Sequence, residues 1–242
     1  MADSPPITDE QLDALKQIPT QTIIDALWID GYPSTTIEGA RPLRPGYQMA
    51  GRAVTLRFVP HRPDLAEDKP KGPASAEYVA FEQCGPGEVL VADALGWSHA
   101  SIGGDIKFYR LFQRDVGGVV TDGSVRDSNA LNEYGFPIYC HGTTPNQGPA
   151  DFWPWQVNDV VQCGGVLVRP GDGIVGDDDG VVVVPRTKVD RVIKLANERH
   201  AVEEVIKAQL ATEDTSPGKY YPFNEATWKL YEEKTGNKRE YL

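Results

Sequence analysis

A stretch of short strand-like runs between residues 160 and 184 constrains the fold of this chain most strongly. Val166-Leu-Val, Gly173-Ile-Val-Gly and Val181-Val-Val-Val follow one another there, separated by Gly, Asp and Pro residues. Valine and isoleucine favour strands, and the separating residues favour tight turns. Apolar spacing and end signals predict helices elsewhere, at residues 8–18, 20–29, 74–83, 104–116, 128–134 and 188–210. This mixture predicts an α/β protein whose mixed sheet packs on helices.

Further strands are expected at residues 53–59, 88–93, 119–120 and 137–139. The order of these elements shows no regular βαβ succession. In the second helix, we expect the apolar face to comprise Ile23, Ile24, Leu27 and Trp28. Residues 60–73 are polar and proline-rich, which predicts an exposed loop. The chain after Thr212 is polar but rich in aromatic residues.

The balance of charge separates this chain from proteins that bind nucleic acid. Asp and Glu number 35 against 24 Lys and Arg, which gives a net charge of −11 without a segregated basic patch. Such a field repels nucleic acid, so no nucleic-acid partner is expected. No run of about 18 apolar residues is present, so we expect no membrane partner. Three cysteines without a CxxC pair, and an N-terminus without a signal-peptide pattern, predict a cytoplasmic protein.

Two segments carry residues suited to chemistry, and the first is Gly103-Gly-Asp-Ile at a predicted helix start. Glycines let a backbone approach a ligand closely, and first-turn N–H groups with the helix dipole attract a carboxylate or phosphate. Asp105 stands where this helix begins, so its carboxylate is a candidate for the site. Asp is also a favoured N-cap, and that structural role explains the residue equally well.

The second segment, Thr121-Asp-Gly-Ser-Val-Arg-Asp, leaves a predicted strand at the end where α/β proteins collect their sites. Asp127 supplies carboxylate oxygens for a hard cation, and Arg126 supplies a permanent positive charge for a substrate oxygen. A surface ion pair is the alternative interpretation of these two neighbours. Together with Asp105, they provide the groups needed to stabilise the enolate of a 2-oxo acid such as pyruvate.

Other candidate residues have simpler explanations. Asp177-Asp-Asp-Gly lies between two strands and is typical of an acidic hairpin turn. Cys84 and Cys163 lie in or beside apolar runs, which favours a packing role over reactivity. The histidines show no metal-ligand spacing such as HExxH.

Asp105 followed, after twenty residues, by Arg126-Asp127 resembles the signature of the 4-hydroxy-4-methyl-2-oxoglutarate / 4-carboxy-4-hydroxy-2-oxoadipate aldolases, whose relatives include the regulator of ribonuclease E activity. The similarity extends over residues 10–210 and includes the motif Cys163-Gly-Gly-Val-Leu-Val-Arg-Pro-Gly-Asp-Gly. The resemblance implies an α-β-β-α sandwich related to swivelling phosphohistidine domains. It implies a single domain, 1–212, with a loop insertion at 60–73 and a C-terminal tail at 213–242.

The resemblance also implies roles for individual residues. Asp127 is the expected ligand of Mg²⁺ or Mn²⁺. Arg126 is expected to hold the 2-oxo oxygen and stabilise the enolate, and Asp105 is expected to orient water and take part in proton transfer. The implied reaction cleaves a 4-hydroxy-2-oxo acid to pyruvate and a carbonyl product, with oxaloacetate decarboxylation as a side activity. The physiological substrate and the choice of metal stay open.

Substrate binding and assembly follow from the same resemblance. The backbone at Gly104, Ile106 and Lys107 is expected to receive the carboxylate of the 2-oxo acid substrate. The implied assembly is a homotrimer or a hexamer with its sites between subunits. Glu203 or Glu204 of a neighbouring subunit is expected to contribute to each site.

Two other functions compete with that of a metal-dependent lyase. The chain can instead act as a non-catalytic regulator that binds a ribonuclease, or as a plain interaction scaffold. The resemblance implies that the regulators lack the aspartate after the arginine. The presence of Asp127 therefore favours the enzyme.

Overall fold

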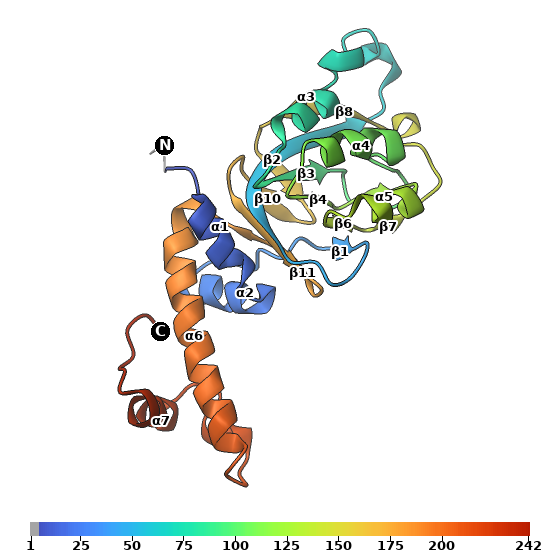
Figure 1. Ribbon diagram of the computed structural model, residues 1–242. Helices are drawn as coiled ribbons and strands as arrows, with labels where there is room; N and C mark the ends of the chain where they lie inside the picture. Colours follow the sequence, from blue (N-terminus) through green and yellow to red (C-terminus); the bar gives the residue numbers. More distant parts are fainter. Residues whose placement is uncertain (1–4) are drawn as a thin grey trace.

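The computed structural model describes residues 5–242, so the first residues of the N-terminus used to judge a signal peptide lie outside it. The prediction of an α/β protein with a mixed sheet is confirmed (Figure 1). The strand order is β1-β6-β4-β3-β2-β11-β12, and β8 pairs with β2 as well. The bounds of these strands are Arg41–Pro42 (β1), Met49–Pro60 (β2), Glu88–Asp93 (β3), Gly118–Thr121 (β4), Ile138–Cys140 (β6), Phe152–Val157 (β8), Gly173–Asp177 (β11) and Gly180–Val184 (β12).

The sheet curls until its two ends nearly meet. Arg41 of β1 donates a hydrogen bond to the carbonyl oxygen of Asp179, in the turn between β11 and β12, at 2.6 Å. The interior of the curl is a buried cluster with members from both ends of the strand order, including Met49, Val91 and Val183. The hairpin of β9 (Val161–Cys163) and β10 (Val166–Val168) adds side chains to this cluster. The relation to phosphohistidine domains stays a prediction.

The central strands β2, β3, β4 and β6 are parallel, and a helix follows each of the first three. These helices are α3 (Ala76–Gln83), α4 (Asp105–Gln113) and α5 (Ser128–Tyr134). The prediction that the chain has no regular βαβ succession is therefore wrong. Long connections at 61–75 and 94–104 separate strand from helix, and β6 has only three residues, so the repeat is hidden in the sequence.

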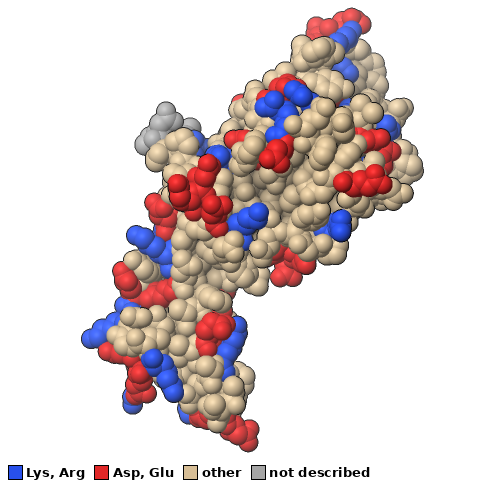
Figure 2. All heavy atoms as spheres, in the orientation of Figure 1, with Lys and Arg blue, Asp and Glu red and all other residues tan. Residues whose placement is uncertain are grey.

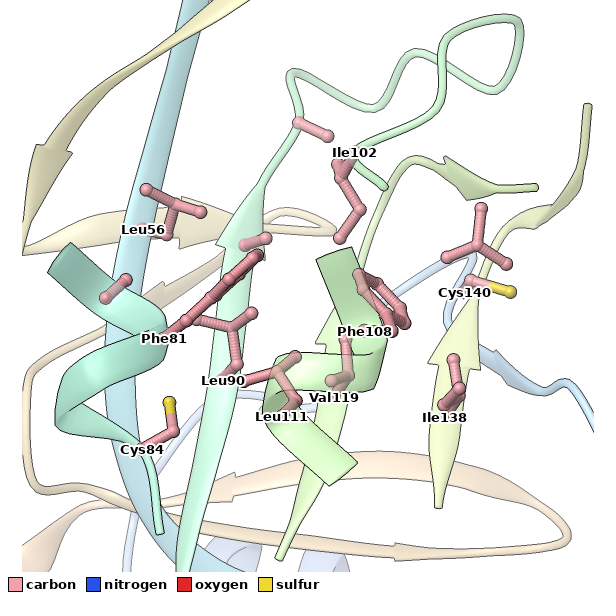
Figure 3. Packing of buried hydrophobic residues seen from close by; sticks show 14 of the residues in the cluster. Leu56, Phe81, Cys84, Leu90, Ile102, Phe108, Leu111, Val119, Ile138 and Cys140 are labelled. Atoms are coloured by element: carbon pink, nitrogen blue, oxygen red, sulfur yellow. The ribbon is translucent and has the colours of Figure 1, made fainter. Parts of the chain in front are cut away.

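Helices α3 and α4 cover one face of the parallel strands (Figure 3). Phe81 from α3, with Phe108 and Leu111 from α4, point into a cluster with Leu90 and Val119 of the strands. The spacing of Ile106, Tyr109, Leu111 and Phe112 predicts this helix, but of these four side chains only that of Leu111 is buried. The prediction of the helix is confirmed, and its buried face carries Phe108 together with Leu111.

Three helices pack against β11 and β12: α1 (Asp9–Lys16), α2 (Thr20–Ile29) and α6 (Val189–Leu210). The capping box of α1 between Thr8 and Gln11 is formed as its sequence predicts. Within α2, Ile23 and Leu27 are buried, but Trp28 is 74% exposed, so its predicted place on the apolar face is wrong. Each residue turns about 100° around a helix, which carries Trp28 past the edge of the buried stripe.

The outer half of α6 extends away from the sheet, and the C-terminal segment packs against this half of the helix (Figure 1). Helix α7 (Glu225–Thr235) packs there in a cluster of Val202, Ile206, Tyr220, Leu230 and Tyr231. The carboxylate of Glu198 accepts hydrogen bonds from the last three backbone N–H groups, at 2.6 to 2.8 Å. The aromatic tail is thus a folded part of the structure.

The connecting segments complete the description. Residues 60–73 form an exposed loop, as predicted, with short 3₁₀ turns at Pro63–Leu65 and Gly72–Ala74. Further 3₁₀ turns lie at Arg186–Lys188 and Pro217–Lys219. No helix within residues 5–242 is long and apolar enough to cross a membrane. Figure 2 shows one face of the molecule, where Lys and Arg are interspersed with Asp and Glu.

Candidate active site

Backbone hydrogen bonds bring the two chemically promising segments side by side. The N–H of Ser124 donates to the carbonyl of Ala100, and the N–H of Ile102 donates to the carbonyl of Ser124. The N–H of Arg126 then donates to the carbonyl of Gly103 at 3.0 Å. This short parallel pairing places the start of α4 beside Arg126 and Asp127, at the end of the segment 121–127. On its other side, β5 (Ser124–Val125) pairs with β7 (Gly142–Thr143).

The carboxylate of Asp127 caps helix α4 from outside that helix. Its Oδ2 accepts a hydrogen bond from the backbone N–H of Asp105 at 3.1 Å. The N-cap residue itself is Gly104, and Asp105 is the first helical residue, so the alternative that Asp105 is the N-cap is wrong. A Cβ atom on Gly104 would lie 2.2 Å from that same Oδ2. Only glycine leaves space for Asp127 to reach the helix.

Arg126 and Asp127 form the ion pair that their adjacency suggested, with 3.5 Å between Nε and Oδ2. Their side chains are 45% and 43% exposed, so the pair is open to solvent and to ligands. Asp127 has a φ of 57°, a left-handed conformation that aspartate tolerates better than most residues. This backbone bend starts α5 immediately after the pair.

Two cavities meet at this ion pair. One, of about 500 Å³, is lined by Tyr78, Ser101, residues 103–107, Arg126, Asp127 and residues 147–149. The other, of about 570 Å³, is lined by residues 126–130 and 143–145. Three residues predicted for catalysis and metal binding, Asp105, Arg126 and Asp127, therefore line one cavity together. Gly104, Ile106 and Lys107, predicted for substrate binding, line it too.

The first turn of α4 forms one wall of the cavity of about 500 Å³. The N–H groups of Ile106 and Lys107 belong to that turn, which has no partners within its own helix. They lie at the positive end of the helix dipole. The side chain of Lys107 is engaged elsewhere, because its Nζ lies 2.6 Å from the carboxylate of buried Glu77. An anion in the cavity is thus more accessible to the backbone N–H of Lys107 than to its ammonium group, which is paired with Glu77.

Sequence reasoning missed Tyr134, the last residue of α5. Its hydroxyl donates a hydrogen bond to Oδ1 of Asp105. That bond to a carboxylate, with some desolvation, raises the pKa of Tyr134 to about 12, so the phenol stays protonated at neutral pH. No spacing rule links two residues on different helices, and the only signal was an aromatic residue at the end of a predicted helix.

Glu203 and Glu204 do not join this site within one chain. Both lie on the outer half of α6, which Figure 1 shows extending away from α4 and α5. Glu203 pairs with Arg199 at 3.2 Å and Glu204 with Lys207 at 2.7 Å. Only a second chain can bring either glutamate to the cavity.

The donor set at the cavity suits a hard cation that keeps most of its own water. Among residues 5–242, no group of three or more His, Cys, Asp or Glu side chains is arranged to hold a metal. Within residues 5–242, the hydrogen bonds and ion pairs of these two carboxylates use Asp127 Oδ2 and Asp105 Oδ1, so each carboxylate retains an acceptor oxygen. Mg²⁺ is commonly held by one or two carboxylates, with water and substrate oxygens completing its shell. The site fits such an ion and does not fit a zinc centre.

The weaker candidates have the structural roles that the sequence predicted. Asp177 closes the hairpin of β11 and β12, and its carboxylate accepts two hydrogen bonds from Thr20. Cys84 and Cys163 are fully buried in two of the hydrophobic clusters. Burial raises the pKa of the Cys84 thiol to about 12, which suppresses its thiolate.

Comparison with known proteins gives consistent matches over most of the chain. Residues 20–183 match the RraA-like family described as Aldolase/RraA. A Halalkalibacterium halodurans protein named "Putative 4-hydroxy-4-methyl-2-oxoglutarate aldolase" is 33% identical over 201 residues, covering 82% of this chain and 89% of that protein.

Solved structures agree with this match. Streptomyces coelicolor RraAS2, described as an unusual member of the RNase ES inhibitor RraA protein family, is 34% identical with a TM-score of 0.76. The alignment covers 85% of this chain and all of that one. An uncharacterised Pseudomonas syringae protein has the same fold, with 23% identity, a TM-score of 0.75 and coverage of 89% and 98%.

The contact at Gly104 leads to a first prediction. In Gly104→Ala, the new Cβ forces the Asp127 carboxylate away from α4, which removes a helix cap worth about 0.5–2 kcal/mol. Gly142→Ala is the matched control, because nothing lies within 4 Å of its added Cβ. Urea denaturation should show a loss for the first variant and little change for the second. The loss should shrink in an Asp127→Ala background, and equal losses in both backgrounds would contradict the assigned contact.

Proposed function

Because the chain belongs to the Aldolase/RraA family, we propose that it is a divalent-metal-dependent lyase that cleaves a 4-hydroxy-2-oxo acid. The products are pyruvate and a carbonyl compound. The observation that carries this proposal is the meeting of Asp105, Arg126 and Asp127 at one cavity beside the start of α4. The aldolase name of the Halalkalibacterium halodurans relative supports it.

Substrate binding uses the positive groups on two walls of the cavity. The N–H groups of Ile106 and Lys107 receive the substrate carboxylate at the α4 N-terminus. Arg126 reaches the adjacent 2-oxo oxygen from the opposite segment. This orientation places the rest of the substrate toward Tyr78 and Gln147, which line the same cavity.

Asp127 is the residue that would hold the cation, through the carboxylate oxygen that does not cap α4. When bound, Mg²⁺ or Mn²⁺ supplies Lewis-acid stabilisation of negative charge on the substrate oxygens. Asp105 lies beside it at the same helix end, and its free carboxylate oxygen would accept a hydrogen bond from water that enters the cavity. Because the chain carries a net charge of −11, an anionic substrate needs this local positive charge to bind.

Cleavage breaks the bond between C3 and C4 of the substrate. The C4 hydroxyl loses its proton and becomes the carbonyl of the leaving product, while the bonding electron pair passes into the enolate of pyruvate. Asp105 takes part in moving that proton through water, and C3 then gains a proton to give pyruvate. Arg126 donates to the enolate oxygen as its charge develops. Loss of CO₂ from oxaloacetate gives the same enolate, so decarboxylation is the expected side activity.

The second candidate function is regulation of a ribonuclease by protein binding. It is favoured by the similarity to the Streptomyces coelicolor structure, which belongs to an RNase inhibitor family. A regulator needs no open polar cavity, whereas Asp127 here combines an exposed carboxylate with a free acceptor oxygen beside Arg126. A screen for pyruvate release from 4-hydroxy-2-oxo acids and oxaloacetate, run beside a ribonuclease inhibition assay, separates the two functions.

The cation requirement can be tested on the wild-type chain and one isosteric variant. EDTA should abolish pyruvate release, and Mg²⁺ or Mn²⁺ should restore it. Asp127→Asn keeps the shape of the side chain but loses the charge that holds the cation, so we expect turnover to fall to background while thermal denaturation changes little. Full activity in EDTA, or an active Asp127→Asn variant, would rule out the proposed role.

The role of Arg126 is tested by separating kcat from KM. An arginine aimed at the 2-oxo oxygen meets full charge only as the enolate forms, so Arg126→Ala should lower kcat by a factor of about 10²–10³. Arg126→Lys should rescue little, because an ammonium lacks the planar fork. Both aldol cleavage and oxaloacetate decarboxylation should slow. If KM alone rises, or only one reaction suffers, Arg126 serves binding and not catalysis.

Assembly as a trimer or hexamer is part of the proposal, with Glu203 or Glu204 reaching a neighbouring site. The exposed apolar side chains of Ile106 and Phe112, which border the cavity helix, support coverage by a second chain. Light scattering should give a mass near three or six times 26.6 kDa. Mixing inactive Arg126→Ala with an inactive Glu203→Ala, Glu204→Ala double variant should restore activity, because some sites regain both halves. A fully active monomer would contradict this assembly.

A further inference from the structure

Helix α5 holds the first residue of α4 at two points. At its start, the carboxylate of Asp127 accepts a hydrogen bond from the backbone N–H of Asp105. At its end, the hydroxyl of Tyr134 donates to the side chain of Asp105. The Tyr134 hydroxyl also lies 3.5 Å from the main-chain oxygen of Asp105. Backbone and side chain of Asp105 are therefore fixed from the same short helix.

The ring of Tyr134 is itself held by the helix that it contacts. It stacks on Phe112, with 5.4 Å between ring centroids and 21° between ring planes. Tyr109 lies against it at 5.8 Å and 55°. These two α4 residues are exposed and lie outside the hydrophobic core, so their ring contacts serve mainly to hold Tyr134. Aromatic pairs at such distances stabilise one another beyond their buried area.

We propose that Tyr134 is a positioning residue for the reaction, which orients the Asp105 carboxylate by occupying one of its oxygens. This role rests on the proposed lyase function. With Oδ1 engaged by the phenol, Oδ2 is the oxygen left to accept a hydrogen bond from water or substrate. An unheld aspartate at a helix start can rotate between rotamers, and a misplacement of about 1 Å costs up to about 100-fold in rate.

The protonation state of the phenol suits this role. The neighbouring Asp105 carboxylate raises the pKa of Tyr134, so at neutral pH the hydroxyl donates and does not compete for a proton. Tyr134 is absent from the lining of both cavities, so it acts on substrate only through Asp105.

Tyr134→Phe removes the hydroxyl and keeps the ring stack. We expect kcat for pyruvate release to fall on the order of 10- to 100-fold, with KM within a factor of about two, since the N–H groups that bind the carboxylate are untouched. Tyr109→Phe is the matched control, because its hydroxyl makes no hydrogen bond among the described residues. That variant should keep the wild-type kcat.

A double-mutant cycle with Asp105→Ala separates positioning from simple stability. If Tyr134 acts through Asp105, Tyr134→Phe should cause no further loss of kcat in the Asp105→Ala background. In urea denaturation of the same four proteins, the losses of unfolding free energy should be non-additive. That result would show the contact between Tyr134 and Asp105 even where turnover is too slow to measure.

Three outcomes overturn the proposal in different ways. Wild-type kcat in Tyr134→Phe, with Asp105→Ala impaired, removes the role of Tyr134 and leaves the lyase function standing. An equal loss of kcat in both backgrounds makes Tyr134 a general structural residue. Absence of turnover by the wild-type protein with every 2-oxo acid removes the lyase function, and the positioning role with it.

Discussion

The hydrogen bond between Oδ2 of Asp127 and the N–H of Asp105 joins the two halves of the site, and most of the surrounding geometry follows from it. It links the connection that leads into α5 with the start of α4, the helix of the preceding βα unit. It also fixes residue 104 as glycine, because any Cβ there would occupy the space of the carboxylate. The left-handed backbone of Asp127 is the conformational cost of aiming that carboxylate at α4.

The same contact determines how charge is distributed at the cavity. One oxygen of Asp127 accepts a hydrogen bond at the positive end of the α4 dipole. Arg126 adds a second positive group at 3.5 Å. An aspartate held in this way still has one oxygen without a partner among residues 5–242. The N–H groups of Ile106 and Lys107 remain for a substrate anion, because Asp127 uses only the first donor of the turn. The proposed cation and the proposed substrate anion would therefore use different groups at one helix end.

Sequence reasoning succeeded where local chemistry decides the structure. The capping box of α1 and the limits of β3 and α5 agree with their end signals, because caps and strand runs are encoded within a few residues. Asp105, Arg126 and Asp127 were chosen from short motifs, and the structure places them at one cavity. Their chemical roles stay predictions. The proximity of these three residues depends on the parallel pairing of residues 100–103 with residues 124–126, which no local sequence pattern predicts.

The failures at individual residues have one physical cause, which is that side-chain contacts depend on partners from distant parts of the chain. Trp28 and Phe112 have the spacing of core residues, but Trp28 is 74% exposed, and Phe112, although it stacks on Tyr134, is 45% exposed. Tyr134 was passed over because its partner lies 29 residues away on another helix. The βαβ order was hidden because its loops are long enough to carry the site residues. Irregular connections obscure the fold and supply the function at once, as is common where loops on a rigid sheet hold the chemistry.

The choice between enzyme and regulator cannot come from the fold, because one fold can carry unrelated functions. It must come from features that one function needs and the other does not. Protein inhibition needs an accessible surface and tolerates most changes in a small polar cavity. The contacts at this cavity are more restrictive than that: Gly104 cannot gain a Cβ without displacing Asp127, and Asp105 is held at both its backbone and its carboxylate. A site in which two carboxylates are held through α4 and α5 has the preorganisation that catalysis demands. That rigidity, more than the names of its relatives, is the physical ground for proposing a lyase reaction.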